Sequence, residues 1–153
     1  MKVFLEEARE ELKRADHLIY VSLKYTRTVD VIKSVIERLI NCLDFVIDKL
    51  LDNAIDKKLI SEKPVNIGLK SNVLKKAYGD AVAEMVSLYT LLRKISRAEY
   101  KKSSEYRRHV TMTATTDDGI HAIDIDKSKE LFFKVKRFVE DAEKLIGGEE
   151  EEQ

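Results

Sequence analysis

The sequence predicts a mainly α-helical protein, a four-helix bundle with a β-hairpin inserted between the third and fourth helices. Four segments place apolar residues at alternating steps of three and four, which is the spacing of one helix face. Residues 109–126 instead alternate apolar and polar positions, as strands do. A chain of 153 residues is long enough for one core. We therefore expect a single domain over residues 1–147, followed by a disordered acidic tail at 148–153.

The first two predicted helices each carry an apolar stripe. Residues 3–24 carry a stripe of Phe4, Ala8, Leu12, Ala15 and Ile19. Thr26 or Thr28 then supplies a hydroxyl cap for a second helix at about 29–57. Two neighbouring stripes widen the apolar arc of this second helix, so it needs cover on two sides. It is predicted to be the central helix or a subunit interface.

The third and fourth predicted helices follow the Pro-bearing connection around Pro64 and Gly68, which stops a helix from crossing it. Ser71 can cap a third helix at about 72–98, whose heptad spacing favours a shallow crossing with a neighbour. A fourth helix is expected at about 127–146, ending at the glycine pair at 147 and 148.

The hairpin at 109–126 turns at Asp118 and Gly119. A two-residue turn pairs Met112 with Ile125, whereas a four-residue turn over 116–119 shifts the partners by two. Both registers keep the same two faces. The apolar face comprises Val110, Met112, Ala114, His121, Ile123 and Ile125. We expect that face to dock on the helices, because a two-stranded hairpin alone is marginally stable in water.

Composition limits the classes of partner. The 28 basic and 28 acidic residues give a formal net charge of +0, so any charge-driven function depends on local asymmetry. No apolar run is long enough to span a membrane, and the N-terminus does not resemble a signal peptide. We expect a cytoplasmic protein without a membrane partner. Abundant Lys and Glu suit a thermophile, and Cys42 among apolar neighbours is expected to be a buried thiol.

Few residues in the sequence form a pattern that is typical of catalysis. His121 and the aspartates at 117, 118, 124 and 126 are possible metal ligands, but their spacing matches no known metal loop. Turn aspartates more often bond nearby backbone N–H groups. No nucleophile elbow or glycine-rich phosphate loop is present. We expect no metal and no cofactor, and a non-catalytic role is favoured over an enzymatic one.

Two segments are candidates for a binding site. Residues 93–109 hold seven Lys or Arg against two Glu, with aromatic residues interleaved. That mixture suits single-stranded RNA, although cations at a helix C-terminus also complement its dipole. The candidate nucleic-acid-binding residues are Arg93, Arg97, Lys101, Lys102, Arg107, Arg108 and His109. A second cluster at the first helix junction forms either a cleft or a capped turn and comprises Tyr20, Lys24, Tyr25, Arg27 and Asp30.

The helical plan resembles that of HEPN-like domains. The resemblance rests on the pattern of EEAREELKRADHLIY (6–20), the long helix TVDVIKSVIERLINCLDFVIDKLL (28–51) and YTLLRKISRAEY (89–100). It implies a bundle that often dimerises and that serves as a metal-independent RNase or an RNA-binding partner. The family's Arg-x4–6-His motif is absent at His17, His109 and His121. The segments LKYTRTVDVI and EYRRHVTM also resemble those of a group of archaeal helical proteins.

Two functional hypotheses follow. The first is a non-catalytic interaction module that forms a homodimer through the second or third helix. The alternative is an HEPN-like RNA-binding protein or ribonuclease that uses the basic segment 93–109.

Overall fold

The structure is a computed structural model, and it describes the backbone of residues 3–151 and the side chains of residues 3–147. The chain is mainly helical with a small antiparallel sheet, as predicted. Its elements are α1 (Glu6–His17), the π-helical turn η1 (Leu18–Ser22), α2 (Leu23–Tyr25), α3 (Val29–Asp56), α4 (Ile67–Tyr78), α5 (Asp80–Arg97), β1 (Glu99–Ser103), β2 (Thr111–Thr116), β3 (Gly119–Ile123) and α6 (Ile125–Glu151).

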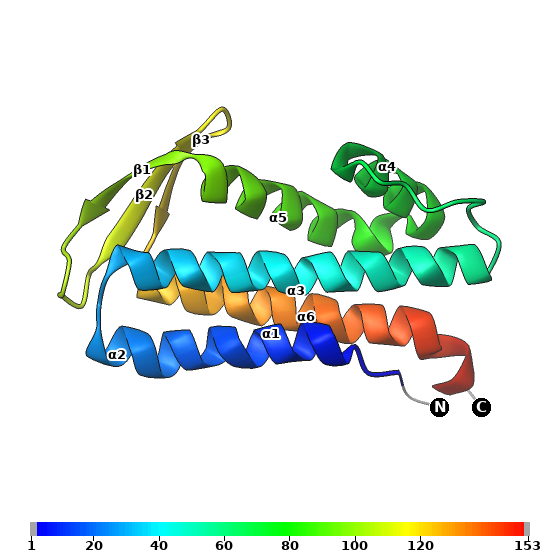
Figure 1. The fold of residues 1–153 in the computed structure, drawn as a ribbon, viewed down its shortest axis with the longest axis horizontal. Helices are drawn as coiled ribbons and strands as arrows, with labels where there is room; N and C mark the ends of the chain where they lie inside the picture. The colour runs from blue at the N-terminus through cyan, green and yellow to red at the C-terminus, as the bar shows by residue number, and fades with distance from the viewer. Residues whose placement is uncertain (1–2, 152–153) are drawn as a thin grey trace.

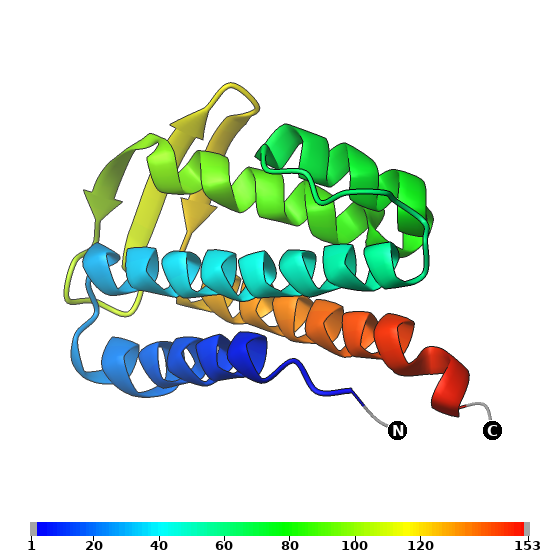
Figure 2. The ribbon, with the colours of Figure 1, turned by 45° about the vertical axis from the view of Figure 1, so that its right-hand side comes forward.

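Helix α3 is the centre of the molecule. It runs between α1 and α5 and packs on α6, with the sheet across one end of the helices (Figures 1 and 2). Thr28 caps it, because its hydroxyl accepts a hydrogen bond from the Val31 N–H at 3.3 Å. Its two apolar stripes are buried apart from the half-buried Ile55. Burial of each such side chain contributes about 1.5–3 kcal/mol. The prediction of a central helix is confirmed, and the neighbours of α3 cover the arc that suggested a subunit interface.

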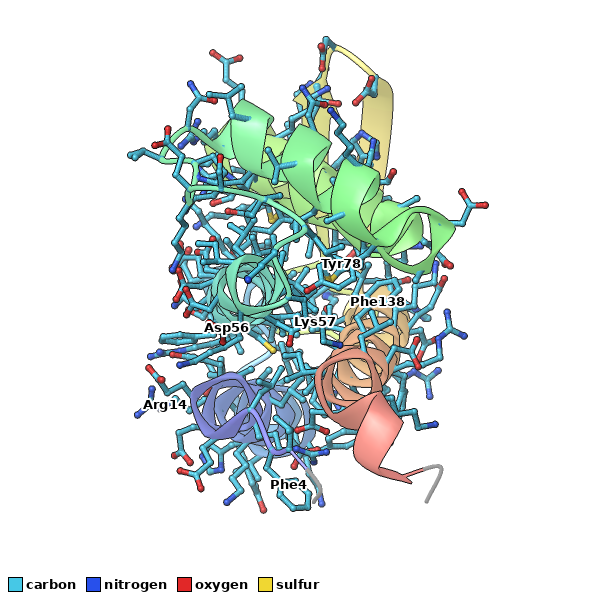
Figure 3. The ribbon with its side chains drawn as sticks, turned by 90° about the vertical axis from the view of Figure 1, so that its right-hand side faces the viewer. Phe4, Arg14, Asp56, Lys57, Tyr78 and Phe138 are labelled. Atoms are coloured by element: carbon cyan, nitrogen blue, oxygen red, sulfur yellow. The ribbon has the colours of Figure 1, made fainter. Side chains whose placement is uncertain are left out.

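Helix α1 begins later than the sequence indicated. Phe4 was expected in the buried stripe, but it precedes the helix and is 59% exposed (Figure 3). The Arg9 guanidinium lies 5.5 Å from its ring centroid. Leu5 is buried in its place. The Glu143 carboxylate of α6 holds this end, since it accepts hydrogen bonds from the Leu5 N–H at 2.9 Å and from Arg9 Nε at 2.7 Å. A buried carboxylate thus joins the start of the chain to the C-terminal part of α6.

The predicted helix at 72–98 is two helices. Gly79 has a φ of +63° and ends α4, so α4 folds back along α5. Such a φ strains residues with a side chain, which explains why the chain breaks at this glycine. Asn66 caps α4 instead of Ser71, because its side-chain oxygen accepts a hydrogen bond from the Gly68 N–H at 2.7 Å. The heptad pattern continued across the break because both helices contribute to one core.

The predicted hairpin belongs to a three-stranded antiparallel sheet with the order β1-β2-β3. Thr115 pairs with Ile120 and Met112 with Ile123, which is the shifted register considered above. Because Thr116 also pairs with Gly119, the turn consists of Asp117 and Asp118, and the predicted turn at Asp118 and Gly119 is wrong. Strand β1 was not predicted. Its sequence EYKKS is exposed at every position except a half-buried Tyr100, so it shows no apolar alternation. Lysines on such an edge strand also discourage pairing with another chain.

The sheet buries one face against the helices, and four of the six residues predicted for this face are buried. Val110, Met112, Ala114 and Ile123 are at most 2% exposed, and the sheet contacts α3, α5 and α6. His121 is half-buried, and Ile125 begins α6 instead of extending the hairpin. The opposite face is lined by threonines and by a 73% exposed Ile120. The sheet therefore closes one end of the helical core.

Helix α6 extends beyond its predicted end. It continues through the glycine pair at 147 and 148 to Glu151, and residues 152 and 153 of the acidic tail lie outside the described residues. Of the helices described between residues 3 and 151, none is long and apolar enough to cross a lipid bilayer.

Candidate functional site

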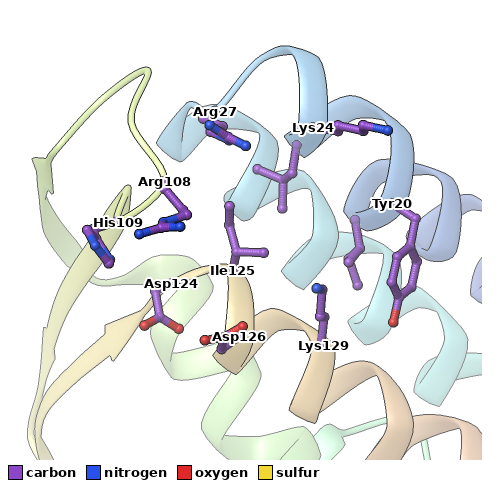
Figure 4. A pocket seen from close by; sticks show the side chains of 11 residues that line it. Tyr20, Lys24, Arg27, Arg108, His109, Asp124, Ile125, Asp126 and Lys129 are labelled. Carbon is purple, nitrogen blue, oxygen red and sulfur yellow. The ribbon is translucent and has the colours of Figure 1, made fainter.

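A cleft of about 680 Å³ lies where the sheet meets the first helical segment and the start of α6 (Figure 4). We call it the cationic cleft. Its floor is apolar and is formed by Ile19, Leu23 and Ile125. Its polar walls comprise Tyr20, Lys24, Arg27, Arg108, His109, Asp124, Asp126 and Lys129. The volume lies in the range of about 300–1,000 Å³ that small-molecule sites occupy.

The first wall is the π-helical turn η1. A π-turn holds one residue more than an α-turn, and such turns occur frequently at functional sites. In this protein the turn places Ile19 in the floor of the cleft, where it is 2% exposed. The next residue, Tyr20, lies in the wall and is 41% exposed. The Lys129 ammonium of α6 lies 5.4 Å from the Tyr20 ring centroid, within cation–π range. The two residues connect opposite sides of the cleft.

The second wall combines the short α2–α3 connection with the loop at 104–110. The Tyr106 N–H donates to the Arg27 carbonyl at 2.6 Å, and Glu105 Oε2 accepts from the Val29 N–H at 3.0 Å. The Glu105 carboxylate therefore caps α3 from a segment 76 residues away in the chain. These bonds hold Arg108 and His109 beside Arg27 (Figure 4).

The loop at 104–110 has a strained backbone. Ser104 and Tyr106 have φ values of 55° and 66°, which non-glycine residues rarely adopt. Two turns follow one another, closed by bonds from Arg107 N to the Ser104 carbonyl and from Val110 N to the Arg107 carbonyl, each 3.0 Å. Strain of this kind concentrates at functional sites, where the surrounding structure enforces it.

The third wall is the first turn of α6. Asp124 caps this helix, since its Oδ1 accepts from the Lys127 N–H at 2.7 Å and its carbonyl accepts from the Ser128 hydroxyl at 2.8 Å. The first N–H groups of a helix have no intrahelical partner and carry a partial positive charge. The start of α6 therefore adds to the positive potential of the cleft, while the exposed Asp126 opposes it.

The charges in the cleft are unbalanced. It contains four cations and two carboxylates. No cation of the cleft has a carboxylate within 4.0 Å among the residues whose side chains the structure describes. The buried Nε of Arg27 likewise lacks a hydrogen-bond partner in that part of the chain. Like charges held near one another without counter-ions favour an anionic ligand.

Two tyrosines stand on the segments that border the cleft. Tyr25 is 78% exposed and Tyr106 is 76% exposed. Tyr25 follows Lys24 in the first helical segment, and Tyr106 lies in the strained loop pinned to Arg27. Exposed aromatic rings next to cations are the combination on which unpaired bases stack.

The structure brings together parts of both predicted sites. Tyr20, Lys24 and Arg27 of the helix junction meet Arg108 and His109 of the basic segment in this one cleft. The other two junction residues, Tyr25 and Asp30, do not line it. Asp30 instead accepts a hydrogen bond from Lys102 at 3.3 Å.

The remaining predicted cations lie elsewhere. Lys101 sits on the outer face of the sheet, opposite Thr113, and Arg107 is exposed on the loop. Arg93 and Arg97 line a separate groove of about 330 Å³ between α3 and α5, together with Glu37. The basic segment is therefore not one surface.

Arg93 is engaged within the protein. Its guanidinium carbon lies 5.6 Å from the Tyr89 ring centroid, and its Nη1 is 3.4 Å from the Tyr89 hydroxyl, which donates to Asp44. Burial, together with the hydrogen bond to Asp44, raises the pKa of Tyr89 to about 12, so this hydroxyl stays a donor. Arg93 therefore has a structural role in this chain of contacts.

A second cavity, of about 640 Å³ between α1 and α3, is also lined by cations. Two of these cations already form ion pairs. Arg14 and Arg38 each lie 3.2 Å from a carboxylate oxygen of Glu11, which is 7% exposed. His17 lies there too, apart from the other two histidines. Glu11 pairs with both arginines, whereas no cation of the cationic cleft has a carboxylate within 4.0 Å among the residues whose side chains the structure describes, so the cationic cleft is the better candidate for an anion site.

Cys42 is not a candidate nucleophile. It is fully buried in α3, and burial, assisted by the charge of Glu11, raises its pKa to about 12. The thiol is therefore protonated at neutral pH, and the reactive thiolate is not populated.

Sequence reasoning missed the contribution of α6. Lys129 and Asp126 line the cleft; Lys129 was not proposed as a site residue, and Asp126 was considered only as a possible metal ligand. A signal was present, since Asp124 followed by helix-forming residues indicates a helix N-terminus. That this N-terminus faces the first helix junction depends on tertiary packing. Comparison of the chain with protein-family models, with curated proteins and with solved structures finds no match.

Proposed function

We propose that the protein binds single-stranded RNA at the cationic cleft. The observation that carries this proposal is the convergence of Lys24, Arg27, Arg108 and Lys129, none of which has a carboxylate within 4.0 Å in the described residues, although Asp124 and Asp126 line the same cleft. Phosphates require such cations, and the exposed rings of Tyr25 and Tyr106 offer stacking surfaces for bases. The formal net charge of the whole chain is +0, so the protein as a whole does not attract anions. In this proposal the local excess of cations in the cleft attracts the anionic partner.

The proposal concerns binding, not cleavage. A general base needs a hydrogen-bond partner that orients it, and no described side chain bonds to the His109 ring. His109 therefore contributes a polar, aromatic surface at the cleft wall in this proposal.

Salt-dependent binding tests the proposal. We expect a mixed-sequence single-stranded RNA to bind in low salt, with affinity that falls linearly on a log–log plot against salt concentration. Arg108→Ala should weaken binding about tenfold and reduce the slope by about 0.7, the contribution of one phosphate contact to a single strand. The matched control is Arg137→Ala, an exposed arginine about 12 Å further along α6 than Lys129. Equal affinity of both variants and wild type would remove the cleft from the proposal.

A homodimer is a second candidate, and one surface favours it. Leu59, Val65 and Leu69, around the α3–α4 connection, are 51%, 90% and 56% exposed. Light scattering at rising concentration tests this interface. A mass of about twice 17.7 kDa that returns to the monomer in Val65→Ser supports it, and a monomer throughout refutes it.

A further inference from the structure

We propose that the cationic cleft takes the phosphorylated end of an RNA strand, a terminal phosphate monoester, in preference to the phosphodiesters inside the strand. This inference rests on the proposed RNA binding and deepens it. Three properties of the cleft carry it: its size, its excess of cations and its apolar floor.

The size of the cleft fits the end of a strand. Proteins that bind the interior of single strands use long grooves that follow the backbone over about 4–16 nucleotides per domain. The cleft has about 680 Å³ and is lined by residues of only three short segments. That is the scale of a site for one small ligand. A terminal nucleotide enters such a site without requiring the chain to leave on the other side.

The charge of the cleft exceeds what one phosphodiester needs. A terminal phosphate carries about −1.5 to −2 charges at neutral pH and three acceptor oxygens, whereas a diester carries one charge. Of the two carboxylates in the cleft, Asp124 already accepts the Lys127 N–H through Oδ1. Arg27 and Arg108 both present several donors, and the buried Arg27 Nε has no partner in the described part of the chain. Guanidinium groups bind phosphate oxygens in pairs, which suits a monoester.

The floor separates the phosphate from the base. The apolar surface open to a base is that of the half-buried Ile125 and of the 41% exposed Tyr20 ring, because Ile19 and Leu23 are at most 2% exposed. A nucleotide has the matching two parts, a charged phosphate and a largely apolar base. An inorganic anion uses only the walls, so it should bind more weakly than a nucleotide monophosphate.

The experiment compares three forms of one ten-nucleotide RNA, with a 5′-phosphate, with a 3′-phosphate, or with hydroxyls at both ends. Fluorescence anisotropy with an internal label leaves the ends free. We expect one phosphorylated form to bind at least tenfold more tightly than the hydroxyl form, and the comparison identifies which end is taken. AMP should compete with it, and inorganic phosphate should compete at least tenfold less effectively.

Variants connect this preference to the cleft. Arg108→Ala and Lys129→Ala should each reduce the preference to about twofold or less, whereas Arg137→Ala should keep it. Circular dichroism establishes that each variant is folded. If all three RNA forms bind equally and salt-dependently, the inference fails while the proposed RNA binding stands. If none binds, both fail.

Discussion

The two halves of the basic segment at 93–109 have different environments. In the first half, Arg93 stacks on Tyr89, and Lys94 lies 3.0 Å from Asp118 and 3.4 Å from Asp117. In the second half, Arg108 and His109 face the cationic cleft, and no carboxylate in the described residues lies within salt-bridge distance of Arg108. The net charge read from the sequence does not distinguish the two halves. Only the fold distinguishes cations that stabilise the protein from cations that are free to bind a ligand.

The largest expected effect tests this distinction directly. The double variant Lys24→Ala/Arg108→Ala should lower RNA affinity about 100-fold, because each lost contact with a phosphate costs about 1.5 kcal/mol. Its free energy of unfolding should change by less than about 0.5 kcal/mol, as for other surface positions. The double variant Arg93→Ala/Arg97→Ala should lose stability and keep most of its affinity. Anisotropy and urea unfolding measure the two quantities. The opposite pattern would reverse the roles of the two halves.

Arg9 is a cation that is paired with a carboxylate inside the protein. It donates two hydrogen bonds to Glu143, which is 8% exposed. Burial raises the pKa of Glu143, but the hydrogen bonds from Arg9 and Leu5 and the charge of Arg9 outweigh burial, so the pKa lies below the ordinary 4.5. We expect Glu143→Gln to lower the free energy of unfolding at pH 7 by about 1.5–3 kcal/mol.

The pH dependence of that difference follows from the direction of the shift. A carboxyl whose pKa is lower in the folded state stabilises the fold above its unfolded pKa. The contribution disappears as the pH falls through the lowered, folded-state value. The stability gap between wild type and Glu143→Gln should therefore be constant near neutral pH and shrink below about pH 4.5. Urea unfolding across this range measures it, and a gap that widens in acid would contradict the assignment.

The anchoring of the loop provides an intermediate effect. Glu105→Ala removes the acceptor of the Val29 N–H and should cost about 1 kcal/mol, as the loss of a helix cap does. It should also weaken RNA binding several-fold, because Arg108 is then held less firmly. Glu84→Ala, an exposed carboxylate 3.7 Å from Arg137, is the matched control. Lost stability with unchanged binding would show that the loop conformation does not matter to the site.

The smallest expected effect has the opposite sign. Asp126 is the exposed carboxylate at the cleft, so Asp126→Asn should raise RNA affinity about two- to fivefold through reduced repulsion. Asp141→Asn, on a distant exposed position of α6, should leave the affinity unchanged. Weaker binding of Asp126→Asn would indicate that this carboxylate contacts the ligand directly.

Periodicity predicted the helices where one apolar face is buried, and it failed where that condition does not hold. The stripes of α3 identified its buried positions correctly because the helix is surrounded. The same rule joined α4 to α5 across Gly79, since both helices contribute apolar residues to one core. Strand β1 was missed because its only inward ring is Tyr100, in contact range of Lys33 on α3.

The candidate site was predictable in its components but not in its assembly. The residues of the junction and of the basic segment were both identified, although 81 positions separate Arg27 from Arg108. The contacts that join them, from Tyr106 to Arg27 and from Glu105 to Val29, depend on φ angles that no local pattern requires. Lys129 enters only because α6 starts at the same end of the molecule.

The five residues of η1 have a consequence for how this surface can change during evolution. A π-turn corresponds to an α-helix that has gained one residue. Because the bulge accommodates its extra residue within one turn, removing a single residue between Leu18 and Ser22 would restore a regular helix and leave the flanking segments in place. Tyr20 would turn away while α3 kept its packing. The shape of the cationic cleft at this end of the protein is thus adjustable by chain length, without substitution of the other residues that line it.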